Sequence, residues 1–216
     1  KQLSRIHTLD LQPKSSHQHG TDHHSDHEDH SDHSAHHHDA PDGFDPHIWL
    51  DPAFTQQIAE ATYHQLASLY PSLEPQLKHN LEQFLIGLKE TEQQIKQQLD
   101  PAKQLTIYTF HQAFTHFAEH YGLKISGIIT PTPETRPGAR HLTQLANEIG
   151  QHKQICLVKE PNFKAPYIDS ITKGSDVITT IADPLATNID NSANGYFEFI
   201  SSIANSFSAC ISNASK

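Results

Sequence analysis

From residue 101 onward, the sequence alternates between short apolar runs and longer amphipathic stretches. Because strands that alternate with helices favour a mostly parallel sheet covered on both faces, this pattern predicts an α/β fold with a four-stranded sheet over 101–216. The runs typical of buried strands are 104–110, 123–130, 154–159 and 176–182. The stretches that predict helices are 111–122, 138–150, 165–174 and 195–212.

Three polar residues lie at or just after the ends of these predicted strands. His111 follows the first strand, Glu160 follows the third and Asp183 follows the fourth. Open parallel sheets bind their ligands at the carboxyl ends of the strands. These three side chains are therefore candidate functional residues.

Two helices are predicted ahead of the sheet. Asp51 and Pro52 are typical of an N-cap and a first helical position, and apolar residues follow them at helical spacing. Pro71 ends this helix, and a second apolar stripe predicts a helix over 72–100, about 40 Å long. The stripe extends over fewer than about four heptads, which favours a strut between two lobes over a coiled coil.

Residues 17–38 contain ten histidines interleaved with five acidic residues, unlike the contiguous histidines of a purification tag. The region 14–43 has almost no apolar side chains, so burial cannot offset its ordering entropy and a loop is expected. Neutral imidazole is a good ligand for zinc, copper and nickel. We interpret the run as a low-affinity metal loop, with an inert polar spacer as the alternative. Its candidate ligands are His17, His19, His23, His24, His27, His30, His33, His36, His37 and His38.

Charge and motifs exclude several classes of function. The formal net charge of −10 argues against nucleic-acid binding, which needs clustered Lys and Arg, and favours cations near the surface. The sequence contains no GxSxG, P-loop, GxGxxG or HExxH motif, so no enzyme class is indicated. It also contains no apolar run long enough to predict a membrane span.

Other histidines occur in ordered contexts. His47 precedes the apolar residues Ile48, Trp49 and Leu50, so it is either a structural histidine or a fixed ligand. His116 and His120 are four residues apart and share one helix face, where they could form a surface zinc pair.

Cys156 and Cys210 are the only cysteines. In a reducing compartment both could be buried thiols, whereas in an oxidising compartment they could form one disulfide. Composition alone leaves both states open.

A set of motifs in a fixed order carries a family resemblance. After the His-rich acidic loop come DPHIWLDP, a long predicted helix, FHQAFTHFAEHYGL, PTPETRPGARHL, CLVKEPNF and DPLATNI. This set resembles the ZnuA-type zinc-binding proteins over nearly the whole chain. The resemblance implies a two-lobed metal solute-binding protein with a long backbone helix, which is not an enzyme. It also implies capture of Zn²⁺ in the cleft between the lobes and delivery to the membrane permease of a zinc ABC importer.

The resemblance also implies a division of the chain into five segments. These are 1–13, a remnant of the N-terminal lobe; 14–43, the His-rich metal loop; 44–71, the end of the N-terminal lobe with a metal-site motif; 72–100, the linker helix; and 101–216, the C-terminal α/β lobe.

Metal ligands follow from the same motifs. His47 corresponds to the second cleft histidine of the family and His111 to the third. Asp183 matches an acid that binds the metal in manganese-binding relatives and lies near it in zinc-binding ones. Glu160 corresponds to a position that in the family is either near the site or structural. A histidine at 111 in place of glutamate favours the zinc-binding subgroup.

The resemblance extends to the cysteines and to the location of the protein. Cys156 and Cys210 match a disulfide of some zinc-type members, which implies an extracytoplasmic, periplasmic protein. The family's first metal histidine lies ahead of the His-rich loop, and His7 does not match its context. We therefore expect this histidine, together with a signal or lipid anchor, upstream of residue 1, and we expect a monomer.

Three alternatives remain at this point. A manganese or broad divalent-cation binding protein would prefer more carboxylate ligands, so His111 argues against it. An adhesin is a second alternative. A zinc-dependent hydrolase would need a bound water beside a general base.

Overall fold

The structure is a computed structural model that describes residues 45–130, 132, 135–161 and 167–214. The chain enters through a 3₁₀ turn, η1 (Ile48–Leu50), followed by the long helices α1 (Pro52–Leu69) and α2 (Glu74–Leu99). Two further 3₁₀ turns are η2 (Pro71–Leu73) between these helices and η3 (Asp100–Gln104) after them. The strands are β1 (Ile107–His111), β2 (Ile125–Thr130), β3 (Gln154–Lys159) and β4 (Asp176–Ile181). The remaining helices are α3 (Thr115–Tyr121), α4 (Ala139–Ile149), α5 (Ile168–Ile171) and α6 (Gly195–Ala214).

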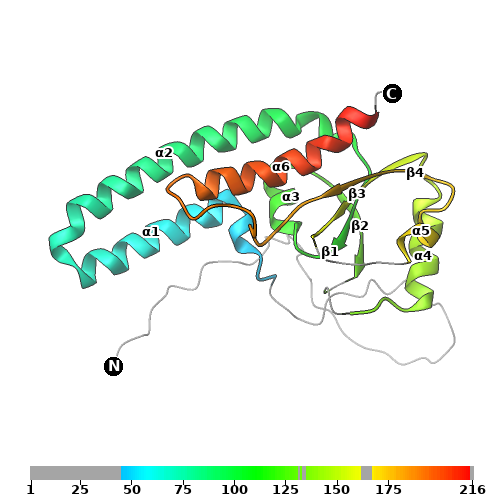
Figure 1. Cartoon of the computed structure of the whole chain (residues 1–216), viewed down its shortest axis with the longest axis horizontal. Helices are drawn as coiled ribbons and strands as arrows, with labels where there is room; N and C mark the ends of the chain where they lie inside the picture. Colours follow the sequence, from blue (N-terminus) through cyan, green and yellow to red (C-terminus); the bar gives the residue numbers. More distant parts are fainter. Residues whose placement is uncertain (1–44, 131, 133–134, 162–166, 215–216) are drawn as a thin grey trace, which may run out of the picture. The chain divides into compact units, whose positions relative to one another are not determined.

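The four strands form one parallel sheet in the order β2-β1-β3-β4. This confirms the fold class predicted from the alternation of strand and helix. Figure 1 shows the sheet on the right, with α4 and α5 at its far right and with α6 extending from the sheet along the helical part of the chain.

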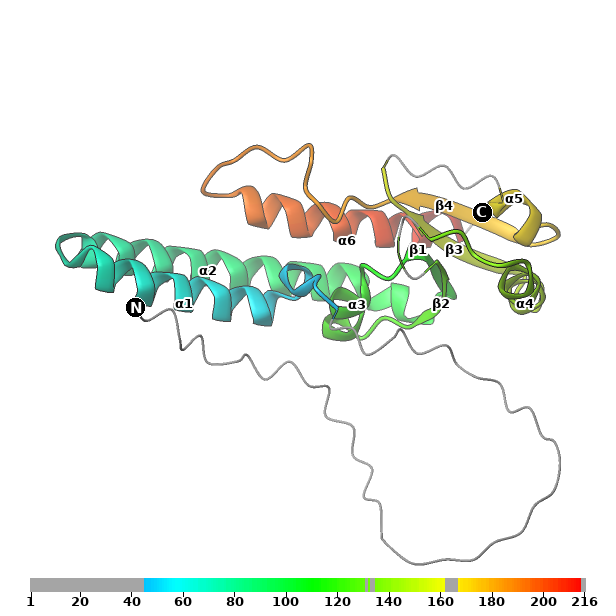
Figure 2. The same ribbon diagram turned by 90° about the horizontal axis from the view of Figure 1, so that it is seen from below.

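Alternate residues of each strand enter two separate cores. On β3, Ile155 and Leu157 pack with α4 and α5, whereas Cys156 and Val158 pack with α3 and α6. Successive side chains of a strand point to opposite faces, so this alternation covers the sheet with a helical layer on each side. Figure 2 shows α6 on the opposite side of the strands from α4.

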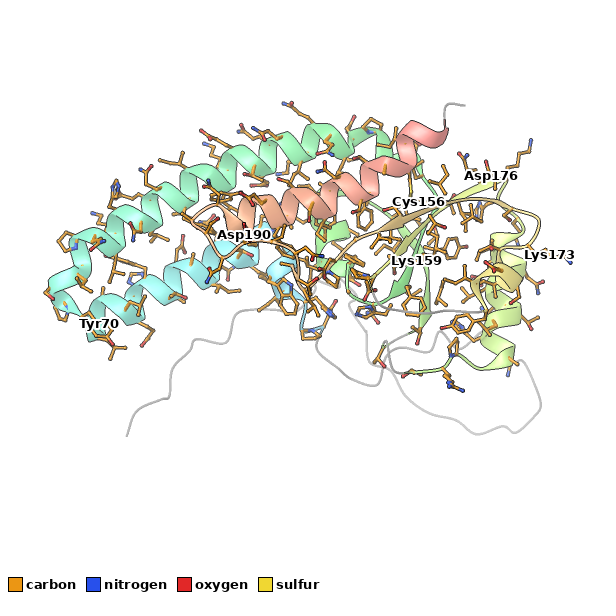
Figure 3. The ribbon with its side chains drawn as sticks, viewed as in Figure 1. Tyr70, Cys156, Lys159, Lys173, Asp176 and Asp190 are labelled. Atoms are coloured by element: carbon orange, nitrogen blue, oxygen red, sulfur yellow. A yellow bond between two sulfur atoms is a disulfide. The ribbon has the colours of Figure 1, made fainter. Side chains whose placement is uncertain are left out.

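The helical hairpin of α1 and α2 begins as the sequence predicted. Pro52 occupies the first turn of α1, and the Asp51 side chain accepts a hydrogen bond of 2.7 Å from the Ala53 backbone N–H. Such a cap satisfies an N–H that has no partner within the helix. Figure 3 labels Tyr70, which ends α1 at the turn into the second helix.

The long predicted helix corresponds to α2, whose 26 residues give a length of about 39 Å. Its apolar stripe is buried most deeply toward the sheet, where Ile95 and Leu99 join the core that contains α3 and α6. Figure 1 shows α6 running alongside α2. The predicted stripe is therefore a packing surface shared with the sheet-bearing part of the chain.

Two of the predicted helices are shorter than expected. The helix expected over 111–122 begins only at Thr115, because His111 still pairs with Thr130 in the sheet and a turn follows. Its end at Gly122 agrees with the prediction, since this residue adopts a left-handed backbone conformation with φ of 69° that favours glycine. The helix expected over 165–174 is only the single turn of α5 within the described residues.

Among residues 45–130, 132, 135–161 and 167–214, the helices do not combine the length and the hydrophobicity that a membrane-spanning segment requires.

Cys156 on β3 and Cys210 on α6 form a disulfide, with Cα atoms 5.7 Å apart. This confirms the pairing that the resemblance implied. The bond closes a loop over a sequence separation of 54 residues and joins the sheet to the helix that covers it. Figure 3 shows Cys156 within the sheet layer.

We expect replacement of both cysteines by alanine to lower the free energy of unfolding by about 2–4 kcal/mol, because the unfolded chain regains the entropy that the cross-link removes. Urea unfolding of the oxidised protein and of the double variant measures the difference. Addition of a thiol reductant should destabilise the parent protein and leave the double variant unchanged. Equal midpoints for both proteins under oxidising conditions would contradict a stabilising disulfide.

Candidate metal centre

The register of two neighbouring strands places His111 beside Glu160. In the pairing of β1 with β3, Thr109 lies opposite Val158, so two residues further along both strands His111 comes level with Glu160. Both side chains are buried. His111 Nδ1 donates to Glu160 Oε1 over 2.5 Å. The structure thus brings together two of the three residues that the sequence placed at strand ends.

A second histidine–carboxylate pair lies in the segment ahead of η1. Asp45 Oδ1 accepts hydrogen bonds from His47 Nδ1 at 2.6 Å and from the His47 backbone N–H at 3.0 Å. Burial raises the pKa of the Asp45 carboxyl, but the two hydrogen bonds from His47 and the nearby His116 outweigh this effect and lower it. Asp45 therefore holds the His47 ring in place through Nδ1.

The histidine rings of the two pairs lie next to each other. The ring centroids of His47 and His111 lie 5.4 Å apart, with an angle of 65° between the ring planes. A zinc–nitrogen bond of about 2.0–2.1 Å places an imidazole centroid about 3.2 Å from the metal, so two rings at a tetrahedral angle lie about 5.2 Å apart. The observed separation of the rings therefore suits two ligands of one zinc ion.

Hydrogen bonds with three other segments of the chain fix the turn that follows His47. The carbonyl oxygen of Trp49 accepts from the Tyr196 hydroxyl of α6 at 3.1 Å and from the Thr55 hydroxyl of α1 at 3.2 Å. Trp49 Nε1 donates to the Pro184 carbonyl oxygen at 2.8 Å. The position of His47 thus depends on α1, on α6 and on the loop after β4.

Asp183 lies in that loop, and its carboxylate accepts hydrogen bonds from other residues of the same loop. Its Oδ1 accepts from the Leu185 backbone N–H at 3.0 Å, and its Oδ2 accepts from the Thr187 N–H at 2.8 Å and from the Thr187 hydroxyl at 2.5 Å. Burial raises the pKa of this carboxyl, but the hydrogen bonds from Thr187 and Leu185 outweigh it and lower the pKa. The carboxylate therefore stabilises a turn of its own chain.

The described residues contain no group of three or more His, Cys, Asp or Glu side chains that could hold a metal ion. Two of the predicted ligands, His47 and His111, lie side by side, and Asp183 is not grouped with them. The ten histidines of the predicted low-affinity loop lie outside the described residues.

Three residues near the site are not among the predicted cleft residues: Asp45, His116 and His120. Asp45 stands two residues before His47, and this close spacing of an acid and a histidine was the available signal. The spacing of His116 and His120 predicts a possible surface zinc pair, but both side chains contact other segments of the chain. His116 lies against Asp45, and His120 lies between Asp51 and a carboxylate of α2.

Comparison with known proteins gives consistent matches. The family described as ZnuA, zinc-uptake complex component A, periplasmic, matches residues 3–210. The high-affinity zinc uptake system protein ZnuA of Yersinia pestis is 33% identical over 189 residues, which are 88% of this chain and 58% of that protein. The protein of the same name from Haemophilus ducreyi is 35% identical over 167 residues, or 77% of this chain and 54% of that protein. The chain therefore spans about half the length of the curated relatives that it matches.

Solved structures share the fold. A crystal structure of ZnuA superposes with a TM-score of 0.61 at 28% identity, covering 76% of this chain and 62% of that chain. The periplasmic zinc-binding protein TroA of Treponema pallidum gives a TM-score of 0.64 at 18% identity, covering 79% of this chain and 65% of that chain. At this identity the match shows only that the two proteins share the α/β fold. The ZnuA family consists of solute-binding proteins and not of enzymes. From the match over residues 3–210, the chain belongs to the ZnuA family of periplasmic zinc-uptake complex components.

Proposed function

We propose that this chain carries the metal-binding part of the periplasmic zinc-binding subunit of a high-affinity zinc ABC importer. The subunit would capture Zn²⁺ as a monomer and deliver it to the membrane permease. The observation that carries this proposal is the pair of imidazole rings of His47 and His111, which come from distant parts of the chain and lie 5.4 Å apart. Membership of the ZnuA family supports zinc as the cargo.

The carboxylates of the site decide which ring nitrogens would bind the metal. Asp45 and Glu160 each accept from Nδ1 of one histidine, so zinc would bind through Nε2 of both rings. A carboxylate on the opposite nitrogen fixes the tautomer and the orientation of a metal-binding imidazole and raises its basicity. This arrangement prepares both rings for a cation.

Asp183 is the proposed third ligand. To reach the metal, its carboxylate would exchange the hydrogen bonds from Leu185 and Thr187 for a bond to zinc. This exchange changes one short loop, which the hydrogen bond from Trp49 to Pro184 already links to the His47 turn. Zinc in proteins is commonly bound by four ligands in a tetrahedron. We assign the fourth to the first metal histidine that the resemblance places ahead of the His-rich loop.

We further propose roles for the segments around the site. Helix α2 would be the backbone helix between two lobes, with 44–71 ending the N-terminal lobe and 101–216 forming the C-terminal one. The contacts of Ile95 and Leu99 with the core that covers the sheet support a rigid connection at one end of this helix. The His-rich loop over 17–38 would collect zinc at low affinity ahead of the main site.

A manganese or broad divalent-cation binding protein is the second candidate. The structure of FpvC from Pseudomonas aeruginosa in complex with Mn²⁺ shares the fold at 17% identity with a TM-score of 0.65. Manganese prefers oxygen ligands, so the pair of imidazoles favours zinc. Family membership argues against the zinc-dependent hydrolase, and no feature of the described residues favours an adhesin.

We expect His47→Ala and His111→Ala each to weaken zinc binding by at least about 100-fold, because each removes a direct ligand, whereas loss of an outer partner costs about 10–100-fold. Competition with a tight chromophoric chelator measures only the high-affinity site. His79→Gln, at an exposed position of α2, is the matched control and should bind as the parent does. Parental affinity in both alanine variants would refute the proposed site.

Glu160→Gln should weaken zinc binding by about 10-fold, because the amide keeps the shape of the side chain but loses the charge that orients and polarises His111. The same competition assay measures the affinity, and thermal unfolding of the metal-free protein checks that the variant is folded. A folded variant with unchanged affinity would show that this carboxylate does not assist metal binding.

Deletion of residues 17–38 should lower the number of zinc ions bound per chain and leave the tightest binding event unchanged. The deletion removes ten imidazoles but neither His47 nor His111. Isothermal titration calorimetry resolves the two classes of site. The same stoichiometry before and after deletion would rule out a collecting role for the loop.

A further inference from the structure

Helix α3 links the two segments that carry the proposed histidine ligands. The helix begins four residues after His111, and a turn connects them. It also contacts η1, which directly follows His47. On its surface, His116 and His120 stand one helical turn apart. Their partners determine what this helix does for the site.

The first of these histidines holds the beginning of the His47 segment. His116 Nε2 donates to the Asp45 carbonyl oxygen at 3.2 Å and lies 3.8 Å from Asp45 Oδ2. The His116 ring also packs edge-on against Phe54 of α1, with centroids 5.4 Å apart. Since Asp45 binds the His47 ring, this contact ties α3 to the residue that orients one proposed ligand.

The second histidine holds the end of the same segment. His120 Nδ1 lies 2.8 Å from Asp51 Oδ1, and His120 Nε2 lies 3.1 Å from Glu92 Oε1 of α2. Carboxylate oxygens accept hydrogen bonds, and an imidazole donates from both nitrogens only when it is protonated. The geometry is therefore that of an imidazolium between two carboxylates.

The surroundings of His120 favour this charged form. Burial alone would lower the pKa of His120, but the hydrogen bond and charge of Asp51, followed by those of Glu92, outweigh it and raise the pKa above its ordinary value. Lys96 on α2 also pairs with Glu92. The His120 ring also packs against the ring of Tyr121. The pKa of Tyr121 is itself raised, mainly by burial. Two carboxylates thus face the ring, and one lysine shares the second of them.

We propose that His116 and His120 are positioning residues through which α3 sets the separation of the His47 and His111 rings. Asp45 and Asp51 flank His47 on either side, so the two contacts hold its segment at both ends. Because the same helix follows His111, a shift of α3 would move both rings relative to each other. The consequence for metal binding rests on the proposed zinc function.

The ion pairs of His120 also impose a pH dependence on the metal-free protein. The folded pKa of His120 lies above the unfolded value of about 6.5, so its stabilising contribution is fully present below that pH. The contribution is lost as pH rises through the folded pKa. Replacement by a neutral residue should therefore cost most near pH 6 and progressively less at higher pH.

The test compares His120→Gln, His120→Arg and the exposed control His79→Gln in the intact chain. For His120→Gln we expect Tm to fall by roughly 3–6 °C near pH 6, with a smaller fall near pH 9. We expect its zinc affinity near pH 7.5 to fall roughly 5- to 10-fold, at or below the lower end of the range for a group bonded directly to a ligand. His120→Arg retains a cation between the carboxylates and should restore affinity. His79→Gln should match the parent.

Two results would overturn the proposal in different ways. A parent that binds zinc and a His120→Gln variant that binds it equally well would refute the positioning role alone and leave the proposed function intact. A parent that fails to bind zinc would refute the proposed function, and the positioning role with it. A loss of Tm that is the same near pH 6 and near pH 9 would refute the imidazolium between two carboxylates.

Discussion

The parallel pairing of β1 with β3 is the constraint on which the rest of the site depends. Its register brings His111 level with Glu160 on the sheet face covered by α3 and α6, and the two buried side chains satisfy each other over 2.5 Å. A buried polar group without a partner is costly, so each residue stabilises the burial of the other. A shift of one residue in register would turn one of the two side chains to the opposite face. The sheet therefore fixes one imidazole before any metal is bound.

The second imidazole depends on tertiary contacts instead of a regular element. His47 precedes a single 3₁₀ turn, and the carbonyl oxygen of Trp49 in that turn accepts hydrogen bonds from α1 and α6. His116 of α3 adds a bond to Asp45 at the other end of the segment. Helices α3 and α6, which cover one face of the sheet, thus converge with α1 on this segment, and the core that α3 and α6 share with β1 also contains Leu50 of the turn.

The sequence was sufficient for most features that depend on local pattern, although two of the predicted helices are shorter than expected. Short apolar runs predicted the strands, and Asp51 with Pro52 predicted the start of α1. The predicted strand ends identified His111 and Glu160 as candidate functional residues. The partners of side chains from distant segments could not be predicted in this way. The spacing of His116 and His120 shows that they share a helix face, but it does not show which segment covers that face. The turn bonds of Asp183 depend on the path of its loop, for which the sequence had no periodic signal.

The proposed ligands differ in how far they are prepared for the metal. The rings of His47 and His111 already stand at a separation that suits one zinc ion, and a carboxylate fixes each of them. Asp183 instead stabilises its own turn through three hydrogen bonds, which zinc binding would have to replace. A prepared pair lowers the entropic cost of capture, because no ring has to be ordered when the metal arrives. A third ligand with an alternative set of hydrogen bonds lowers the cost of release, because its carboxylate keeps partners after the metal leaves. Both properties agree with the proposed capture and delivery of zinc.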